Sequence, residues 1–130
     1  MLDVNRQKLE YPELKREIIA MIEKWKPNVS LIEDKASGQT LLQDLQRETN
    51  FPFIAMKPIH DKVIRFARIT PLFEAGKVFL PKYRSWCVDY ESEIMLFPCS
   101  IYSDQVDSTS QYFSYIFNRN TAKPSIRSTL

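Results

Sequence analysis

The chain has 130 residues, of which 44% are hydrophobic and 26% charged, with a formal net charge of +2. This length suits one domain, and the apolar content is sufficient for a packed core, so global disorder is excluded. No apolar run approaches the ~18 residues that span a bilayer, and the start MLDVNRQKLEY lacks the pattern of a signal peptide, so we expect a soluble, intracellular protein with no membrane partner.

The first half of the chain alternates between strand and helix patterns. The predicted elements are, in order, a strand over residues 2–6, an amphipathic helix from Pro12 to before Pro27, a strand over 29–32, a flexible loop over 36–38, a helix over 39–48 and a strand over 51–56. Because a helix lies between successive strands, we expect parallel pairing and an α/β sheet.

The second half reads mainly as helices. The predicted elements are a helix opened by Asp61 and continued from Pro71 to Ala75, a strand over 78–80, a helix capped by Ser85 that runs to Leu96, and a helix over 104–117. The polar composition beyond Asn118 predicts a frayed tail.

The charges are divided into two neighbouring tracts. Residues 57–84 carry seven bases against two acids, a local net charge of +5, whereas residues 85–107 carry five acids and no base, a local net charge of −5. A basic tract beside an acidic one suits a polyanion-binding protein with a cation site. The alternative is a set of solvated helix faces.

The stretch LIEDKASG at residues 31–38 places two acids at the end of a buried strand. Open α/β sheets bind their ligands at such strand ends. Strand alternation sends Glu33 and Asp34 to opposite faces, and we select Glu33 as the candidate site residue. The alternative is that both acids cap the following loop.

The stretch SDQVDS at residues 103–108 places Asp104 and Asp107 three residues apart at a helix start, where both can reach one cation. Helix capping by Asp104 and a favourable charge from Asp107 in the first turn are the alternative. A cation site is better supported if the fold brings Glu33 and Asp104 together.

Other chemistries lack the residues they need. The chain has two glycines, so a glycine-rich phosphate loop is excluded. Cys87 and Cys99 form no CxxC motif, and His60 is the one histidine, so a zinc site lacks ligands and we interpret both thiols as reduced rather than as a disulfide. We interpret His60 as a surface residue rather than a catalytic base.

Read together, these segments resemble the C-terminal nuclease domain of the large terminase subunit of tailed bacteriophages. The likeness covers residue 2 to about residue 115, in the stretches LDVNRQKLEYPELKREIIAMIEKWKP, LIEDKASGQTLLQDLQRE, KPIHDKVIRFARITPLFEAGKVFLP and SDQVDSTSQ. The resemblance implies an RNase H-like α/β fold, with a mixed sheet flanked by helices. It also implies an endonuclease that acts in the cytoplasm of the bacterial host cell. This enzyme would cut concatemeric viral DNA with Mg²⁺ or Mn²⁺.

The resemblance also implies roles for single residues. Glu33 matches the family acid at the end of a central strand and Asp104 the aspartate that opens the last helix, so both are expected to be catalytic acids and metal ligands, with Asp107 as a further ligand. The candidate contacts to phosphates of double-stranded DNA are Lys35, Lys57, Lys62, Arg65, Lys82 and Arg84. Lys62 and Arg65 have the alternative of bracing the acidic cluster.

The family's first strand, with its aspartate, would lie before Met1. We therefore expect a partial domain over residues 1–117, a flexible tail over 118–130, and weak binding of a single divalent ion with poor or no cleavage. The alternative function is an inactive prophage-derived remnant that binds only DNA, the portal protein or another terminase subunit. The sheet edge left open by the missing strand would permit a homodimer.

Overall fold

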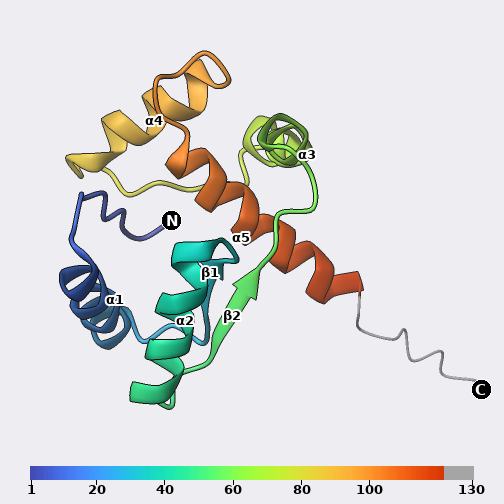
Figure 1. Cartoon of the computed structure of the whole chain (residues 1–130). Coiled ribbons are helices and arrows are strands. Elements are labelled where there is room, and N and C mark those ends of the chain that lie inside the picture. Colours follow the sequence, from blue (N-terminus) through green and yellow to red (C-terminus); the bar gives the residue numbers. More distant parts are fainter. Residues whose placement is uncertain (122–130) are drawn as a thin grey trace, which may run out of the picture. The chain divides into compact units, whose positions relative to one another are not determined.

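The computed structural model describes residues 1–121, and side chains are considered up to Arg119 (Figure 1). The elements are α1 (Tyr11–Trp25), β1 (Ser30–Glu33), α2 (Ala36–Glu48), β2 (Phe53–Met56), α3 (Lys62–Glu74), α4 (Trp86–Leu96) and α5 (Asp104–Thr121). They form two compact units, each described here by itself. The strand unit is Asn5–Ile59, and the helical unit is Met1–Val4 with the chain from His60 onward.

The strand unit is built on two parallel strands. Ser30 of β1 lies opposite Phe53 of β2, and Glu33 lies opposite Met56, so the C-terminal ends of the two strands lie side by side. The parallel pairing expected from the order of elements is confirmed. Apolar side chains of α2 cover the strands, because Leu41, Leu45 and Phe53 form one buried cluster.

Helix α1 packs on that cluster through one face. Its half-buried Ile18, Ile19 and Ile22 contact the core, which is the apolar stripe that the sequence predicts. The helix ends as predicted before Pro27, with Lys26 in the left-handed conformation at φ 44° and its N–H donated to the Ile22 carbonyl.

The helical unit is held by α5, which packs against both α3 and α4. Its fully buried apolar side chains are Ile69 of α3, Tyr90 of α4 and Val106 of α5. Asp61 caps α3 as predicted, accepting a hydrogen bond from the Ile64 backbone N–H. Pro71 lies inside one continuous α3, so the predicted fresh start at this residue does not interrupt the helix.

Two predicted strands are wrong. Residues 2–6 and 78–80 form no strand in the described part of the chain, because neither short apolar run finds a pairing partner. The predicted loop over 36–38 is also wrong, since α2 begins at Ala36. The expected mixed sheet is represented, within residues 1–121, by the two parallel strands alone.

The last helix runs to Thr121, four residues beyond the predicted end at Phe117, so the predicted tail begins inside α5. The rest of that tail, residues 122–130, lies outside the described residues. Cys87 and Cys99 are both free, as expected. No helix in the described range is long and apolar enough to cross a bilayer.

Candidate functional site

Glu33 is the last residue of β1, the position that the sequence predicts for it. Its side chain is 28% exposed, and its Oε1 atom lies 2.8 Å from the ammonium nitrogen of Lys35. Lys35 stands directly before α2. It was predicted to contact a DNA phosphate, and it is instead paired with Glu33, the predicted catalytic acid. The carboxylate of Glu33 therefore stands at the edge of the strand unit with its charge partly balanced.

Asp34 follows the strand and has a structural role. Its N–H donates to the Met56 carbonyl at 2.9 Å, which extends the pairing of β1 and β2 by one bond. Its side chain accepts a hydrogen bond from Gln39 Nε2 at 2.7 Å. The loop-capping alternative thus describes the side chain of Asp34, whereas the side chain of Glu33 pairs with Lys35.

Gly38 explains why α2 can begin so close to the strand end. A Cβ atom at this position would collide with the backbone carbonyl oxygen of Glu33. Because glycine has no Cβ, the first turn of α2 packs directly against the backbone that carries Glu33. In the sequence, this glycine resembled a flexible loop residue.

Asp104 is the first residue of α5 and is exposed. The Asp107 N–H donates to the Ser103 carbonyl at 2.9 Å, so Ser103 precedes the first turn and the expected cap position is displaced by one residue. Asp107 lies in the first turn as predicted, but its side chain is only 13% exposed. The two acids therefore share a helix start and differ in their access to solvent.

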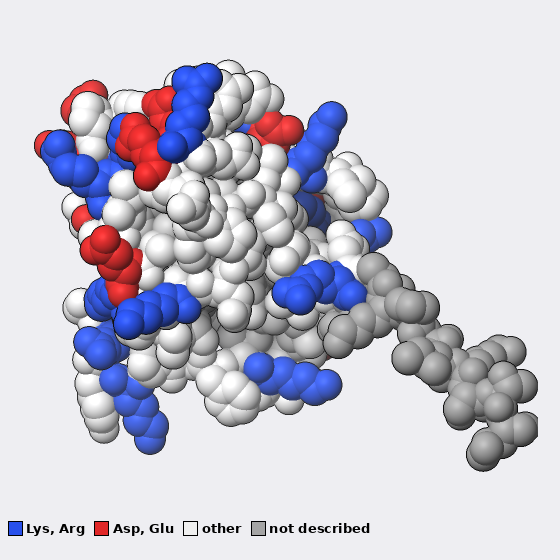
Figure 2. Space-filling view, turned by 90° about the horizontal axis from the view of Figure 1, so that it is seen from below, with Lys and Arg blue, Asp and Glu red and all other residues white. Residues whose placement is uncertain are grey.

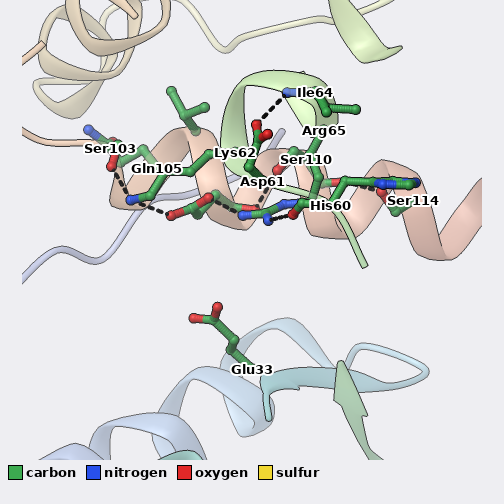
Figure 3. A network of polar contacts seen from close by, with 12 residues as sticks. Glu33, His60, Asp61, Lys62, Ile64, Arg65, Ser103, Gln105, Ser110 and Ser114 are labelled. Carbon is green, nitrogen blue, oxygen red and sulfur yellow. Dashed lines mark hydrogen bonds and ion pairs between the residues drawn. The ribbon is translucent and has the colours of Figure 1, made fainter. Parts of the chain in front are cut away.

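Asp107 is the centre of a polar network between α3 and α5 (Figure 3). One carboxylate oxygen contacts Nη2 of Arg65, and the other lies 3.1 Å from Nζ of Lys62. Lys62 also donates to Ser103 Oγ at 2.7 Å. Arg65 donates through Nη1 to the His60 carbonyl. Lys62 and Arg65 therefore brace Asp107, one of the three predicted acids.

The network differs in burial from one end to the other. Arg65 is 8% exposed, and its Nε atom has no hydrogen-bond partner in the described structure. A buried guanidinium needs a nearby anion, and Asp107 supplies it. The Lys62 side chain is half exposed, and its ammonium group contacts both Asp107 and Ser103.

Glu93 is a carboxylate that positions α5 and that the sequence analysis missed. It is 5% exposed on α4 and accepts hydrogen bonds from the backbone N–H groups of Gln105 and Val106, at 2.7 and 3.1 Å. These N–H groups belong to the first turn of α5. The N–H groups of a first turn have no acceptor within their own helix. Glu93 therefore caps the helix that carries Asp104 and Asp107.

The remaining predicted phosphate contacts are exposed. Lys57 lies in the strand unit, just after β2, and Lys82 and Arg84 lie in the helical unit between α3 and α4. Lys and Arg side chains stand out into solvent on the face that Figure 2 shows. Lys57, Lys82 and Arg84 have the exposure that contact with a polyanion requires.

The predicted metal ligands belong to different units, Glu33 to the strand unit and Asp104 and Asp107 to the helical unit. No group of three His, Cys, Asp or Glu residues with the spacing of a metal site occurs within the described chain. The carboxylates of Glu33 and Asp104 are the hard oxygen donors that Mg²⁺ and Mn²⁺ prefer, so their chemistry fits the expected ion. Asp107 would have to break its ion pair with Arg65 or Lys62 before it could bind such an ion.

Comparison with protein-family models matches residues 1–115 of the chain to a terminase RNase H-like domain. No curated protein and no solved structure matches the chain. The matched range includes both strands, Glu33, Asp104 and the network around Asp107.

Proposed function

Because the chain belongs to the terminase RNase H-like domain family, we propose that it is a metal-dependent DNA endonuclease domain. Its substrate is concatemeric viral DNA, cut in the host cytoplasm during genome packaging, and its partners are the portal protein and other terminase subunits. The observation that carries the proposal is the family match together with Glu33 at the end of β1. The two parallel strands are then part of a mixed, RNase H-like sheet.

Glu33 and Asp104 are the catalytic acids of this proposal. Their carboxylate oxygens would serve as ligands of a divalent ion, Mg²⁺ or Mn²⁺. The ion, when bound, supplies the positive charge that activates water and stabilises the leaving oxygen. Glu33 is held in place by the strand and by the close start of α2, and Asp104 by the first turn of α5.

Asp107 has a positioning role in the structure described here, and its role as a ligand stays a prediction. Its ion pairs with Lys62 and Arg65 fix the first turn of α5 against α3. In this proposal, exposed cations neutralise the phosphates of DNA. They are Lys35, Lys57, Lys82 and Arg84, and Lys62 can contribute as well.

The test is cleavage of supercoiled plasmid by the purified chain at low salt, with Mn²⁺, Mg²⁺ or EDTA. The proposal predicts slow conversion of the plasmid to nicked DNA with a divalent ion, in keeping with the weak binding of a single ion expected from the sequence, and intact plasmid in EDTA. A folded protein that leaves the plasmid intact with both metals, or that cuts equally well in EDTA, contradicts the proposal.

A second candidate function is DNA or partner binding without cleavage. The observation that favours it is the pairing of two candidate acids with cations, Glu33 with Lys35 and Asp107 with Arg65. This candidate predicts DNA binding that weakens steeply with salt and is unchanged by EDTA. Metal-dependent cleavage of the plasmid rejects it.

The sheet has a consequence for assembly. Within residues 1–121, β1 and β2 each pair with one neighbour, so each strand has an edge without a pairing strand. Such edges accept strands from other chains. We therefore keep the homodimer as a proposal, which sedimentation equilibrium at several protein concentrations tests, and a monomer at all of them rejects it.

A further inference from the structure

Residues 77–84, called the aromatic loop below, connect α3 to α4 without forming a helix or strand (Figure 1). Their sequence KVFLPKYR contains three cations and no acid. Two of its aromatic side chains point into solvent, because Phe79 is 75% and Tyr83 100% exposed. The loop therefore combines exposed aromatic rings with a purely basic charge.

The tip of this loop is held in one shape by Cys87, in the first turn of α4. The Cys87 N–H donates to the Arg84 carbonyl at 3.1 Å, and its Sγ donates to the Pro81 carbonyl at 3.2 Å. One residue thus fastens both ends of the turn that presents Tyr83. The other end of the loop is fixed by a 2.9 Å hydrogen bond from the Lys77 N–H to the Leu72 carbonyl.

Tyr83 has no packing role in the fold. Its ring is wholly exposed, and its backbone adopts φ 63°, a region that residues with a Cβ atom rarely enter. The turn therefore presents an exposed aromatic face between the exposed Lys82 and Arg84. Proteins that bind single strands combine the same two groups, an aromatic ring that stacks on a base and cations that contact the phosphates.

We propose that the aromatic loop binds unpaired nucleotides of DNA, with Tyr83 stacked on a base and Lys82 and Arg84 on the flanking phosphates. The proposal rests on the proposed function only in taking DNA as the polyanion. A duplex hides the faces of its bases within the stack, so Tyr83 acts on single-stranded segments, such as the frayed ends that cleavage produces.

The test compares binding of a labelled single strand of about 16 nucleotides, and of the duplex of the same length, by fluorescence anisotropy in EDTA. Tyr83→Ala is expected to weaken single-strand binding about 5- to 150-fold, the range measured for loss of one stacked base. Tyr83→Phe keeps the ring and should bind as the unaltered protein does. Tyr112→Ala, which removes a half-exposed tyrosine of α5, is the matched control.

The cations have a separate readout. Removing Lys82 or Arg84 should flatten the dependence of log Kd on log salt by about 0.7 per side chain. Undetectable binding of the single strand, equal affinity of Tyr83→Ala and the unaltered protein, or an equal loss on the duplex overturns the proposal. Because binding is measured in EDTA, these outcomes are independent of whether the chain cuts DNA.

Discussion

Asp107 links α5 to α3, since it balances the charge of the buried Arg65. Asp107→Asn leaves that guanidinium without an anion. Loss of one partner of a buried pair costs about 3 kcal/mol or more of unfolding free energy. We expect a loss of this size in urea denaturation, and an Asp104→Asn control, exposed on the same helix, within about 0.5 kcal/mol of the unaltered protein. Equal midpoints for both variants would contradict the role given to Asp107.

Tyr11 provides a pH-dependent test in the strand unit. Its hydroxyl donates to Asp44 at 2.6 Å, and this hydrogen bond, with the negative charges of Asp44 and Glu48, raises the pKa of Tyr11 to about 12. Because the folded pKa lies above the ordinary value of 10.0, the contact stabilises the fold below pH ~10 and is lost as the pH rises through about 12.

The measurement is the ultraviolet absorbance of tyrosinate, titrated as the difference between the unaltered protein and Tyr11→Phe. Asp44→Asn should return the pKa of Tyr11 toward its ordinary value. An unchanged Tyr11 titration in Asp44→Asn would show that this carboxylate is not the cause.

Single residues differ in how much of their role the sequence revealed. Glu33 was predictable because a short apolar run that ends abruptly in acids marks a strand end. Glu93 was not, because an acid in the middle of a helix has the same pattern as a solvated one. Its partners, the N–H groups of Gln105 and Val106, lie on another element that only the tertiary fold brings near.

At the scale of elements, the close approach of α2 to β1 predicts that Gly38→Ala is destabilising. Alanine is favoured over glycine in a helix by about 1 kcal/mol, but its Cβ would meet the Glu33 carbonyl. Overpacking of this kind costs about 1–3 kcal/mol, so we expect a net loss of stability in urea. Ser37→Ala, on an exposed neighbour in the same turn, should be close to neutral. A stabilised Gly38→Ala would refute the close packing.

The start of α5 depends on a different element, since Glu93 of α4 caps it. Glu93→Ala leaves buried N–H groups without acceptors and is expected to cost about 2–3 kcal/mol. Amide hydrogen exchange locates the effect, because Gln105 and Val106 should lose protection first. Glu91→Ala changes an exposed acid of the same helix and should leave both amides protected. Retained protection in Glu93→Ala would remove this carboxylate as the cap.

The elements were predicted with unequal success for a physical reason. Helices α1 and α5 carry local signals, a proline at the first turn and acids at the start, so their beginnings were close to the observed ones. A strand depends on a partner elsewhere in the chain. The apolar run at 78–80 has none in the described structure, and it is part of the exposed aromatic loop instead.

At the scale of the whole molecule, the single partial domain over residues 1–117 stays a prediction, and the described chain consists of two compact units, the strand unit and the helical unit. The parallel sheet followed from the alternation of helices and strands. The division into two units could not be predicted from the sequence, because it depends on which helix faces contact one another. The two candidate catalytic acids lie one in each unit, Glu33 in the strand unit and Asp104 in the helical unit.

The most direct test of this account measures the rate of Mn²⁺-dependent plasmid cleavage in four variants, each shown to be folded. Glu33→Ala is paired with Asp34→Ala, its neighbour at the strand end, and Asp104→Ala with Asp89→Ala, an exposed acid in the first turn of α4. Altering a residue that only supports a metal ligand lowers activity about 10- to 100-fold. Loss of the ligand itself is therefore expected to slow cleavage more than about 100-fold. The account predicts this loss in Glu33→Ala and Asp104→Ala and near-normal rates in the two controls. Cleavage by Glu33→Ala or Asp104→Ala at the rate of its control would contradict it.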